Sequence, residues 1–269
     1  MVLRGLCMEV RFVVLRFQPI AAMNHGSLFS GIGGFDLAAE QAGFTNIFHV
    51  EIDALNREHL HLAFPNAHSY ADIRQFDGTP YRGTIDIISG GFPCQDISPS
   101  KAPRGGKAQG IKGPKSGLWS EYARVVREVR PAIVCFENSA MLLRRGLEYV
   151  LCDLSQLGYD TEWRCFYAAQ FGYDHFRPRI YGLAYARGHR WHHLIENGGI
   201  LQEIPAGGPP RQARVTMPAQ RIDRRSDFGR LRMDDGFPAE LDKAKIFSYG
   251  NAIVVDIARV IFSYLKNEL

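Results

Sequence analysis

Short apolar runs alternate with segments of helical periodicity between Gly26 and about Tyr185. Strands are predicted at 27–29, 47–50, 85–89, 133–136, 163–167 and 180–184, and helices at 36–41, 54–63, 118–129 and 147–157. Such alternation is typical of a mainly parallel sheet with helices on both faces, so the sequence predicts an α/β fold. In sheets of this kind, ligands bind at the carboxyl ends of the strands.

The regular alternation ends after Ala186, where paired glycines and prolines indicate loops. Apolar periodicity returns near residue 230, and 252–265 predicts a closing helix. We therefore expect four regions along the chain. They are an N-terminal extension (1–22), a large α/β domain (23–185), a short basic insert (186–230) and a C-terminal segment that packs back on the large domain (231–269).

Composition places the chain among ordinary globular proteins, with 269 residues, 46% hydrophobic and 22% charged. Its five cysteines include no CxxC pair, which disfavours a disulfide framework or a four-cysteine zinc site and favours a reducing compartment. We expect no transmembrane helix. The apolar stretch 1–22 contains four charged residues and makes a poor signal peptide, so we expect it to be an extension, with Met23 as an alternative start.

Positive charge is concentrated in two loop-like segments, although the net charge is only +4. Segment 99–117 holds five cations and no acid, and 186–230 holds eight arginines against four acids. This distribution favours a polyanionic partner, while two solvated loops are the alternative that charge alone does not exclude. The cations singled out as candidate contacts are Lys107, Lys112, Lys115, Arg221 and Arg224.

A glycine turn, LFSGIGGF at 28–35, follows the first predicted strand and opens a helix. Glycines such as Gly31 and Gly33 let the backbone turn tightly and approach a ligand closely. Glu51 ends the second strand, where a carboxylate can accept two ribose hydroxyls, and Asp72 could accept an adenine amino group. Because the turn lacks the longer GxGxxG spacing and a Walker lysine, we expect an adenosyl ligand without a pyrophosphate. An ordinary βα turn is the alternative.

Cys94 lies in GGFPCQDIS, directly after the strongest predicted strand. Pro93 fixes the backbone before it, and a thiol at the end of a strand is placed to act as a nucleophile. The alternative is a small buried hydrophobe, which is how we interpret the other four cysteines.

Glu137 ends the following strand, where a buried carboxyl group can hold a proton near neutral pH. The alternative is a helix-capping pair in which Asn138 caps the next segment. Arg177 and Arg179 are two residues apart in an extended segment, so they point to the same side. Paired guanidinium groups suit a pyrimidine carbonyl and a phosphate or carboxylate, and a surface salt bridge is the alternative.

These motifs, in this order, resemble the cytosine-5 DNA methyltransferase family of bacterial and phage type. The resemblance implies the Rossmann-like fold of S-adenosylmethionine-dependent methyltransferases, with a small basic recognition insert. It implies S-adenosylmethionine as cofactor, surrounded by Phe29, Glu51, Asp72, the backbone of Gly31 and Gly33, and Asn251. The motifs are FSGIGGF at 29–35, GFPCQDIS at 91–98, ENS at 137–139, FRPR at 176–179 and GNAIVV at 250–255.

The same resemblance implies Cys94 as the nucleophile, Glu137 at cytosine N3, and Arg177 and Arg179 orienting Glu137 or the base. Segment 99–117 would then close on double-stranded DNA, and 186–230 would be a short target-recognition region. A cognate restriction endonuclease as partner and a cytoplasmic, nucleoid-associated location in a bacterial or phage-infected cell are further expectations.

Two alternative functions stay open beside DNA methylation. One is methylation of tRNA, although the CFT element of that branch is missing from the sequence. The other is a degenerate, non-catalytic DNA-binding homologue, against which the retained motifs argue. The sequence also departs from the family pattern, because Ser139 stands in place of valine, His175 in place of glutamine, and 186–230 is short.

Overall fold

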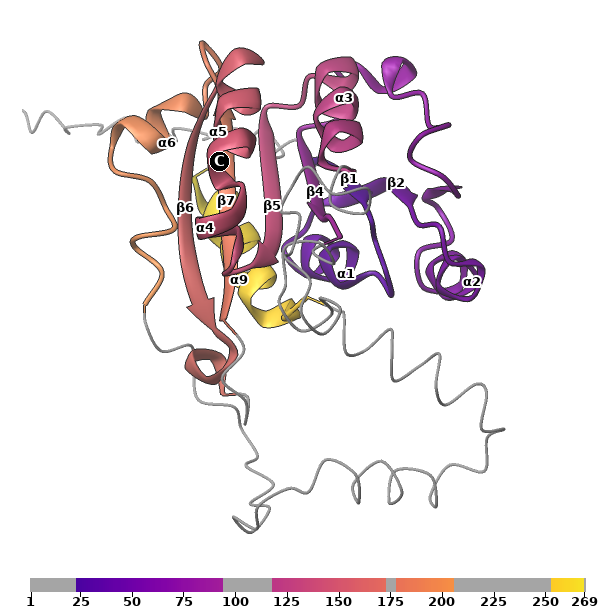
Figure 1. Ribbon diagram of the computed structural model, residues 1–269. Coiled ribbons are helices and arrows are strands. Elements are labelled where there is room, and N and C mark those ends of the chain that lie inside the picture. Colours follow the sequence, from indigo (N-terminus) through magenta and orange to yellow (C-terminus); the bar gives the residue numbers. More distant parts are fainter. Residues whose placement is uncertain (1–22, 94–117, 173–177, 206–252, 269) are drawn as a thin grey trace, which may run out of the picture.

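A seven-stranded sheet forms the centre of the computed structural model, which describes residues 23–93, 118–172, 178–205 and 253–268 (Figure 1). The strand order is β3-β2-β1-β4-β5-β7-β6. The first five of these are parallel, whereas β7 runs antiparallel to both β5 and β6. The strands are β1 (Asn24–Leu28), β2 (Thr45–Val50), β3 (His68–Tyr70), β4 (Ile87–Gly91), β5 (Ile133–Ser139), β6 (Tyr159–Tyr167) and β7 (Pro178–Ala186). The predicted α/β fold with a mainly parallel sheet is confirmed.

Helices cover both faces of this sheet. Helices α1 and α9 pack on one face through residues such as Phe35 and Phe262, and α3 and α5 pack on the other through residues such as Tyr122 and Val150. The helices are α1 (Gly34–Gln41), α2 (Ala54–Ala63), α3 (Trp119–Val129), α4 (Leu142–Arg145), α5 (Leu147–Gln156), α6 (His192–Glu196) and α9 (Val255–Asn267). Two 3-10 turns are η1 (Thr79–Tyr81) and η4 (Ala168–Phe171). None of the helices described in these ranges is long and apolar enough to cross a membrane.

Burial on both faces explains why the central strands read as continuous apolar runs. Along β5, Ile133 and Cys135 face the α1–α9 layer, and Val134 and Phe136 face the α3–α5 layer. All four side chains are completely buried. A strand of a parallel sheet that is covered on both sides has no solvent face, so its polar alternation is lost.

Strand β4 covers 87–91, so it begins and ends later along the chain than the predicted 85–89. Gly90 and Gly91 belong to the strand rather than to the following turn, and they pair with Phe136 and Glu137 of β5. A Cβ on Gly90 would lie 2.6 Å from the carbonyl oxygen of Leu28 in β1. Glycine is therefore required where the two backbones approach closely.

The chain beyond Ala186 is more ordered than its loop-like composition suggests. Helix α6 forms there, and Ile200, Leu201 and Ile204 are buried against the large core. Their segment is anchored to β6, because Arg164 donates hydrogen bonds to the carbonyls of Leu201 and Ile204 at 2.7 and 2.8 Å. The expected extension 1–22, residues 206–230 of the expected insert 186–230 and residues 231–252 of the expected C-terminal segment 231–269 lie outside the described residues, so the domain boundaries stay predictions.

Candidate functional site

The carboxyl ends of the parallel strands meet at one edge of the sheet, the lower edge in Figure 1, toward which the arrowhead of β6 points. Three loops leave this edge and carry predicted site residues. The glycine turn follows β1, Glu51 follows β2, and Asp72 follows β3. Glu137 reaches the same edge within β5. The fold therefore places these candidates where ligands bind in open α/β sheets.

Three left-handed residues shape the glycine turn. Gly31 and Gly33 have φ angles of 57° and 84°, and Phe29 has a φ of 53°, which is unusual for a residue with a side chain. Such a conformation costs about 1–3 kcal/mol and is concentrated at functional sites. A Cβ on Gly31 would meet no atom of the described residues within 4 Å, so this part of the structure leaves space beside the turn.

Glu51 connects this turn to the start of α2 through its two carboxylate oxygens. Oε2 accepts the backbone N–H of Gly31 at 2.7 Å, and Oε1 accepts that of Asp53 at 2.8 Å. Glu51 is only 8% exposed, yet Ile52 beside it is 67% exposed. The carboxylate thus joins the glycine turn to the end of β2 and retains lone pairs for further hydrogen bonds.

A buried carboxyl group supports the glycine turn from below. The Ser27 hydroxyl contacts Oδ1 of Asp36 at 2.8 Å and the Ser30 hydroxyl at 2.6 Å, and the Ser30 N–H donates to the carbonyl of Val50 at 3.1 Å. Burial raises the pKa of Asp36 to about 7, although the Ser27 hydrogen bond opposes that shift. The first turn of α1 therefore contains a buried carboxyl group whose pKa lies near neutral pH.

A buried histidine near the start of β1 links three strands of the sheet. Nδ1 of His25 in β1 lies 2.6 Å from Oδ1 of Asn46, and Nε2 lies 2.7 Å from the Ser89 hydroxyl. Because an amide oxygen only accepts, Nδ1 carries the proton and Nε2 accepts from Ser89. Burial lowers the pKa of His25 to about 4, so the ring is neutral and structural. No local pattern in the sequence marks this residue.

Asp72 lies at the expected place, but its carboxylate is bound by a neighbour. Arg74 donates from Nη2 to Oδ2 at 2.7 Å and from Nε to Oδ1 at 3.0 Å. This hydrogen bonding holds the pKa of Asp72 below its usual value. The Arg74 side chain is 61% exposed, so the pair lies at the surface.

Glu137 and Arg179 form an ion pair across the end of β5 and the start of β7. Nε of Arg179 lies 2.9 Å from Oε1 of Glu137, and the two side chains are 18% and 10% exposed. On the other side, a Cβ on Gly91 would lie 2.9 Å from Oε2 of Glu137. The missing side chain at Gly91 therefore leaves the space that the Glu137 carboxylate occupies.

Asn138 makes a second connection between β5 and β4. Its Nδ2 donates to the carbonyl of Phe92 at 3.0 Å, and its Oδ1 accepts the N–H of Ser139 at 2.8 Å. The capping role weighed for Asn138 is wrong, because α4 begins after Met141 and has no side-chain cap. Because β5 lies beside β4 in the sheet, the Asn138 side chain holds the Phe92 carbonyl, and this contact is visible only in the structure.

The segment that follows Asn251 packs between the glycine turn and β4. A Cβ on Gly34 would lie 2.6 Å from Cγ1 of Ile253, and one on Gly91 would lie 3.8 Å from Cγ2 of the same residue. Ile253 therefore contributes to this edge of the sheet, where it lies beside both the glycine turn and Gly91 at the end of β4.

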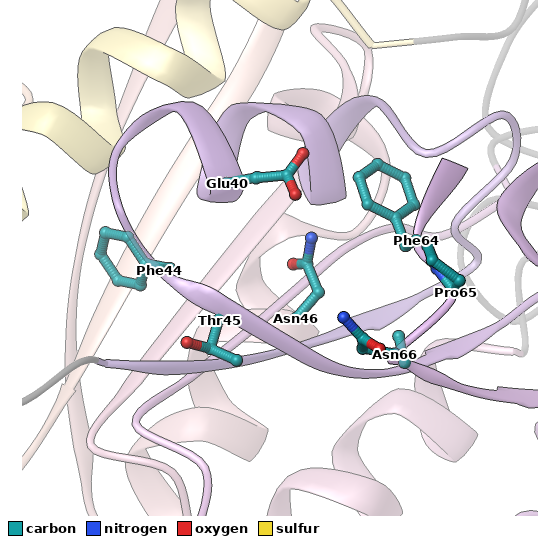
Figure 2. A pocket seen from close by; sticks show the side chains of 8 residues that line it. Glu40, Phe44, Thr45, Asn46, Phe64, Pro65 and Asn66 are labelled. Carbon is teal, nitrogen blue, oxygen red and sulfur yellow. The ribbon is translucent and has the colours of Figure 1, made fainter. Parts of the chain in front are cut away.

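A shallow depression at the opposite edge is not part of this site. It lies where β2 and β3 begin, and Figure 2 shows Glu40 and Asn46 facing it from two sides. Its lining residues are Glu40, Phe44, Thr45, Asn46, Phe64, Pro65, Asn66 and Ala67. Within the described ranges, no group of three or more histidine, cysteine or acidic side chains could hold a metal ion.

Comparison with known proteins agrees with this geometry. The family model for C-5 cytosine-specific DNA methylase matches residues 23–221. The chain belongs to this family. The chain is 35% identical over 166 residues to the type II methyltransferase M2.BsuMI of Bacillus subtilis, an alignment that covers 59% of this chain and 41% of the relative. It is 32% identical over 198 residues to M.Sau3AI of Staphylococcus aureus, covering 67% and 48%.

The chain spans between about a third and a half of the length of the curated relatives that it matches. Among solved structures, a prophage-encoded DNA modification methyltransferase of E. coli superposes with a TM-score of 0.51 at 24% identity, covering 62% of this chain and 47% of the other. The S. pombe Dnmt2 methyltransferase gives 0.51 at 18% identity, covering 74% and 60%. At these identities the structural comparisons support the fold alone.

The structure brings together seven of the residues expected from the sequence: Phe29, Gly31, Gly33, Glu51, Asp72, Glu137 and Arg179. Cys94, Arg177, Asn251, Lys107, Lys112, Lys115, Arg221 and Arg224 lie outside the described residues. Gly91 and Asn138 also lie at this edge, where Gly91 borders the Glu137 carboxylate and Asn138 holds the Phe92 carbonyl, and local sequence pattern did not predict either contact. The polar residues Glu137 and Asn138 directly after the apolar run 133–136 were the one available signal.

Proposed function

We propose that this chain transfers a methyl group from S-adenosylmethionine to carbon 5 of cytosine in double-stranded DNA. The observation that carries the proposal is the Glu137–Arg179 pair at the end of β5, beside the strand that leads to Cys94. A nearly buried carboxyl group that is oriented by a guanidinium group suits recognition of a pyrimidine ring edge. Membership of the C-5 cytosine-specific family supports the same conclusion.

The residues of the glycine turn fit an adenosyl cofactor. The backbone borders open space at Gly31, and Glu51 keeps lone pairs that can accept ribose hydroxyls. Asp72 can accept an adenine amino group once it exchanges one hydrogen bond with the exposed Arg74. Asn251 is proposed to support the same pocket, because Ile253 lies against Gly34. When bound, the cofactor supplies an electrophilic methyl group on a sulfonium sulfur.

Chemistry on cytosine begins with Cys94, whose thiolate bonds to carbon 6. The electron pair displaced from the carbon 5–carbon 6 double bond makes carbon 5 a nucleophile, and Glu137 holds a proton at N3 so that charge does not build up there. Once carbon 5 has bonded to the methyl group, a base removes the carbon 5 proton, the electron pair of that C–H bond re-forms the double bond, and the Cys94 sulfur leaves as a thiolate. General acid assistance of this kind contributes about 10²- to 10⁴-fold in rate.

DNA is proposed to be bound by the two basic segments. Extruding the target cytosine costs a few kcal/mol of unstacking, which phosphate contacts from Lys107, Lys112 and Lys115 would offset. Arg221 and Arg224 are proposed to contact DNA in the short recognition region. Each phosphate contact adds a slope of about −0.9 to the dependence of log K on log salt.

The names of the relatives suggest a biological setting, because they are type II methyltransferases. We therefore also propose a cognate restriction endonuclease of the same sequence specificity. Action on genomic DNA would place the protein in the cytoplasm, at the nucleoid.

Expression in a host without cytosine methylation tests the proposal. Genomic bisulfite sequencing is expected to reveal 5-methylcytosine in one sequence context, and Cys94→Ser is expected to abolish it while cofactor affinity is retained. Methylation by the Cys94→Ser variant would refute the covalent step. Purified wild-type protein is also offered duplex DNA and tRNA, and transfer to tRNA alone, or cofactor binding without transfer, would overturn the DNA assignment.

A further inference from the structure

Asn138 lies between Glu137, the proposed acid, and the end of β4, which leads to Cys94, the proposed nucleophile. It is 1% exposed, and each atom of its amide head group has a partner in the backbone, Phe92 for Nδ2 and Ser139 for Oδ1. A flipped amide would set a donor against the Ser139 N–H and an acceptor against the Phe92 carbonyl. The two partners therefore fix the orientation of the amide and require both a donor and an acceptor at this position.

Phe92 is held by its ring as well as by its carbonyl. The ring is 2% exposed and its centroid lies 5.2 Å from that of Trp119 and 6.5 Å from that of Tyr122, both in α3. The preceding residue, Gly91, is paired in register with Glu137. The last residues of β4 are therefore fixed by strand pairing, by aromatic packing and by the Asn138 amide.

Backbone geometry extends this constraint toward Cys94. A fixed carbonyl oxygen on Phe92 fixes the whole peptide plane between Phe92 and Pro93, because that plane is rigid. The proline ring then holds φ of Pro93 near about −65°. Of the rotations between the Phe92 peptide and the Cα atom of Cys94, ψ of Pro93 alone is left free.

We propose that Asn138 is a positioning residue that sets the chain entering the Cys94 turn relative to Glu137. Side chains alternate along a strand, so Glu137 and Asn138 project from opposite faces of the same end of β5. One side chain holds the proposed acid and the next holds the backbone that leads to the proposed nucleophile. The proposal rests on the proposed function, because it assigns Asn138 to the placement of Cys94.

Two substitutions separate positioning from simple stabilisation. Asn138→Ala removes both hydrogen bonds. Asn138→Asp loses the donor when ionised, but a protonated aspartic acid again donates to Phe92 and accepts from Ser139. Tyr159→Phe is the matched control, because the Tyr159 hydroxyl donates to the carbonyl of Pro131 at 2.7 Å and is also buried, away from the site.

Methyl transfer to DNA is measured together with the cofactor Kd and the unfolding midpoint. Asn138→Ala is expected to lower kcat by about 10²-fold while the cofactor Kd changes by less than about threefold, because misplacement of a reacting group acts on the chemical step. The activity of Asn138→Asp relative to wild type is expected to rise about tenfold for each pH unit by which the pH falls toward the pKa of the introduced carboxyl group. The protonated fraction of that group, which can donate to Phe92, rises by the same factor. A kcat within about threefold of wild type for Asn138→Ala, or an equal loss in Tyr159→Phe, overturns the proposal.

A second readout does not depend on turnover. The rate at which iodoacetamide alkylates Cys94 without DNA, followed by mass mapping of the Cys94 peptide, is expected to change about fivefold or more in Asn138→Ala and to be unaltered in Tyr159→Phe. An unaltered rate in Asn138→Ala overturns the positioning role even when the wild type methylates DNA. A wild type that transfers no methyl group to DNA refutes the proposed function, while the alkylation comparison still decides the role of Asn138.

Discussion

The glycine turn after β1 and the end of β5 lie at the same edge of the sheet but are held by contacts of different range along the chain. Glu51 is 20 residues from Gly31, and Ser27 is 9 residues from Asp36, so the turn is built within one β-α-β unit. At the end of β5, Asn138 reaches Phe92 over 46 residues and Glu137 reaches Arg179 in β7. The first region is fixed by local folding and the second by assembly of the whole sheet.

This difference has a consequence for function. A locally built turn keeps its shape when a distant residue changes, whereas the end of β5 depends on the register of β4 and β7 on either side. We expect substitutions near the turn to affect stability and cofactor binding. Substitutions at the end of β5 should affect the chemical step instead.

Glu137→Gln is expected to have the largest effect. The amide keeps the size of the side chain and can still accept from Arg179, but it cannot hold and release a proton at cytosine N3. We expect kcat for methyl transfer to fall about 10²- to 10⁴-fold, with little change in the cofactor Kd. Single-turnover transfer of labelled methyl groups to DNA measures this.

Glu162→Gln is the control for loss of a nearly buried carboxylate elsewhere in the sheet. Glu162 accepts the Tyr185 hydroxyl at 2.8 Å and the N–H groups of Ile200 and Leu201 at 2.9 and 3.0 Å, and burial raises its pKa. The variant should be less stable, because an amide donor then faces N–H donors. Comparable losses of kcat in both variants would mean that Glu137 acts through the fold and not through the reaction.

Asp36→Asn is expected to change how stability depends on pH. Burial raises the pKa of Asp36 from 3.8 to about 7, so the folded protein binds a proton that the unfolded chain releases between these values. The stability from this group is complete below pH 3.8 and is lost as the pH rises through 7. Between about pH 5 and 8 the wild type should lose about 3 kcal/mol relative to the variant, which does not titrate there.

Urea unfolding of both proteins across that pH range tests this. His25 acts in the opposite sense, because its pKa is lowered from 6.5 to about 4 and its contribution is lost as the pH falls through that window. It is present in both proteins and cancels in the difference. A difference in unfolding free energy that stays constant from pH 5 to 8 would contradict a buried, titrating Asp36.

The same division between local and distant contacts explains what the sequence could predict. Glu51 was predictable because its strand, its turn and its spacing from the glycines all lie within one short segment. The apolar run at 133–136 marked β5 because both faces of that strand are covered. Arg179 was predictable as a candidate from its pairing with Arg177, but its contact with Glu137 depends on β7 lying beside β5.

Gly91, Asn138 and Glu162 could not be interpreted from local pattern. Gly91 was expected in a turn, yet it lies in β4. The residue is glycine there because the Glu137 carboxylate occupies the space that a side chain would take. Glu162 and Arg164 have partners in 200–204, so the packing of that segment could not be inferred from its loop-like composition. In each case the deciding neighbour lies on a strand or segment that is distant along the chain.

Arg74→Ala is expected to have the smallest effect, and it tests the local side of the comparison. Arg74 binds both oxygens of Asp72 but is mostly exposed, and exposed ion pairs contribute little to stability. The unfolding midpoint should therefore be unchanged. Because the Asp72 carboxylate would no longer exchange a guanidinium partner for the adenine amino group, the cofactor Kd should fall by about twofold to threefold, as measured by calorimetry.

Arg82→Ala provides a matched control on the same surface, since Arg82 contacts the carbonyl of Arg127 and no carboxylate of the site. A weaker cofactor affinity in Arg74→Ala alone would show that the guanidinium group holds Asp72 in place for the ligand, so that even this short contact is part of the binding site.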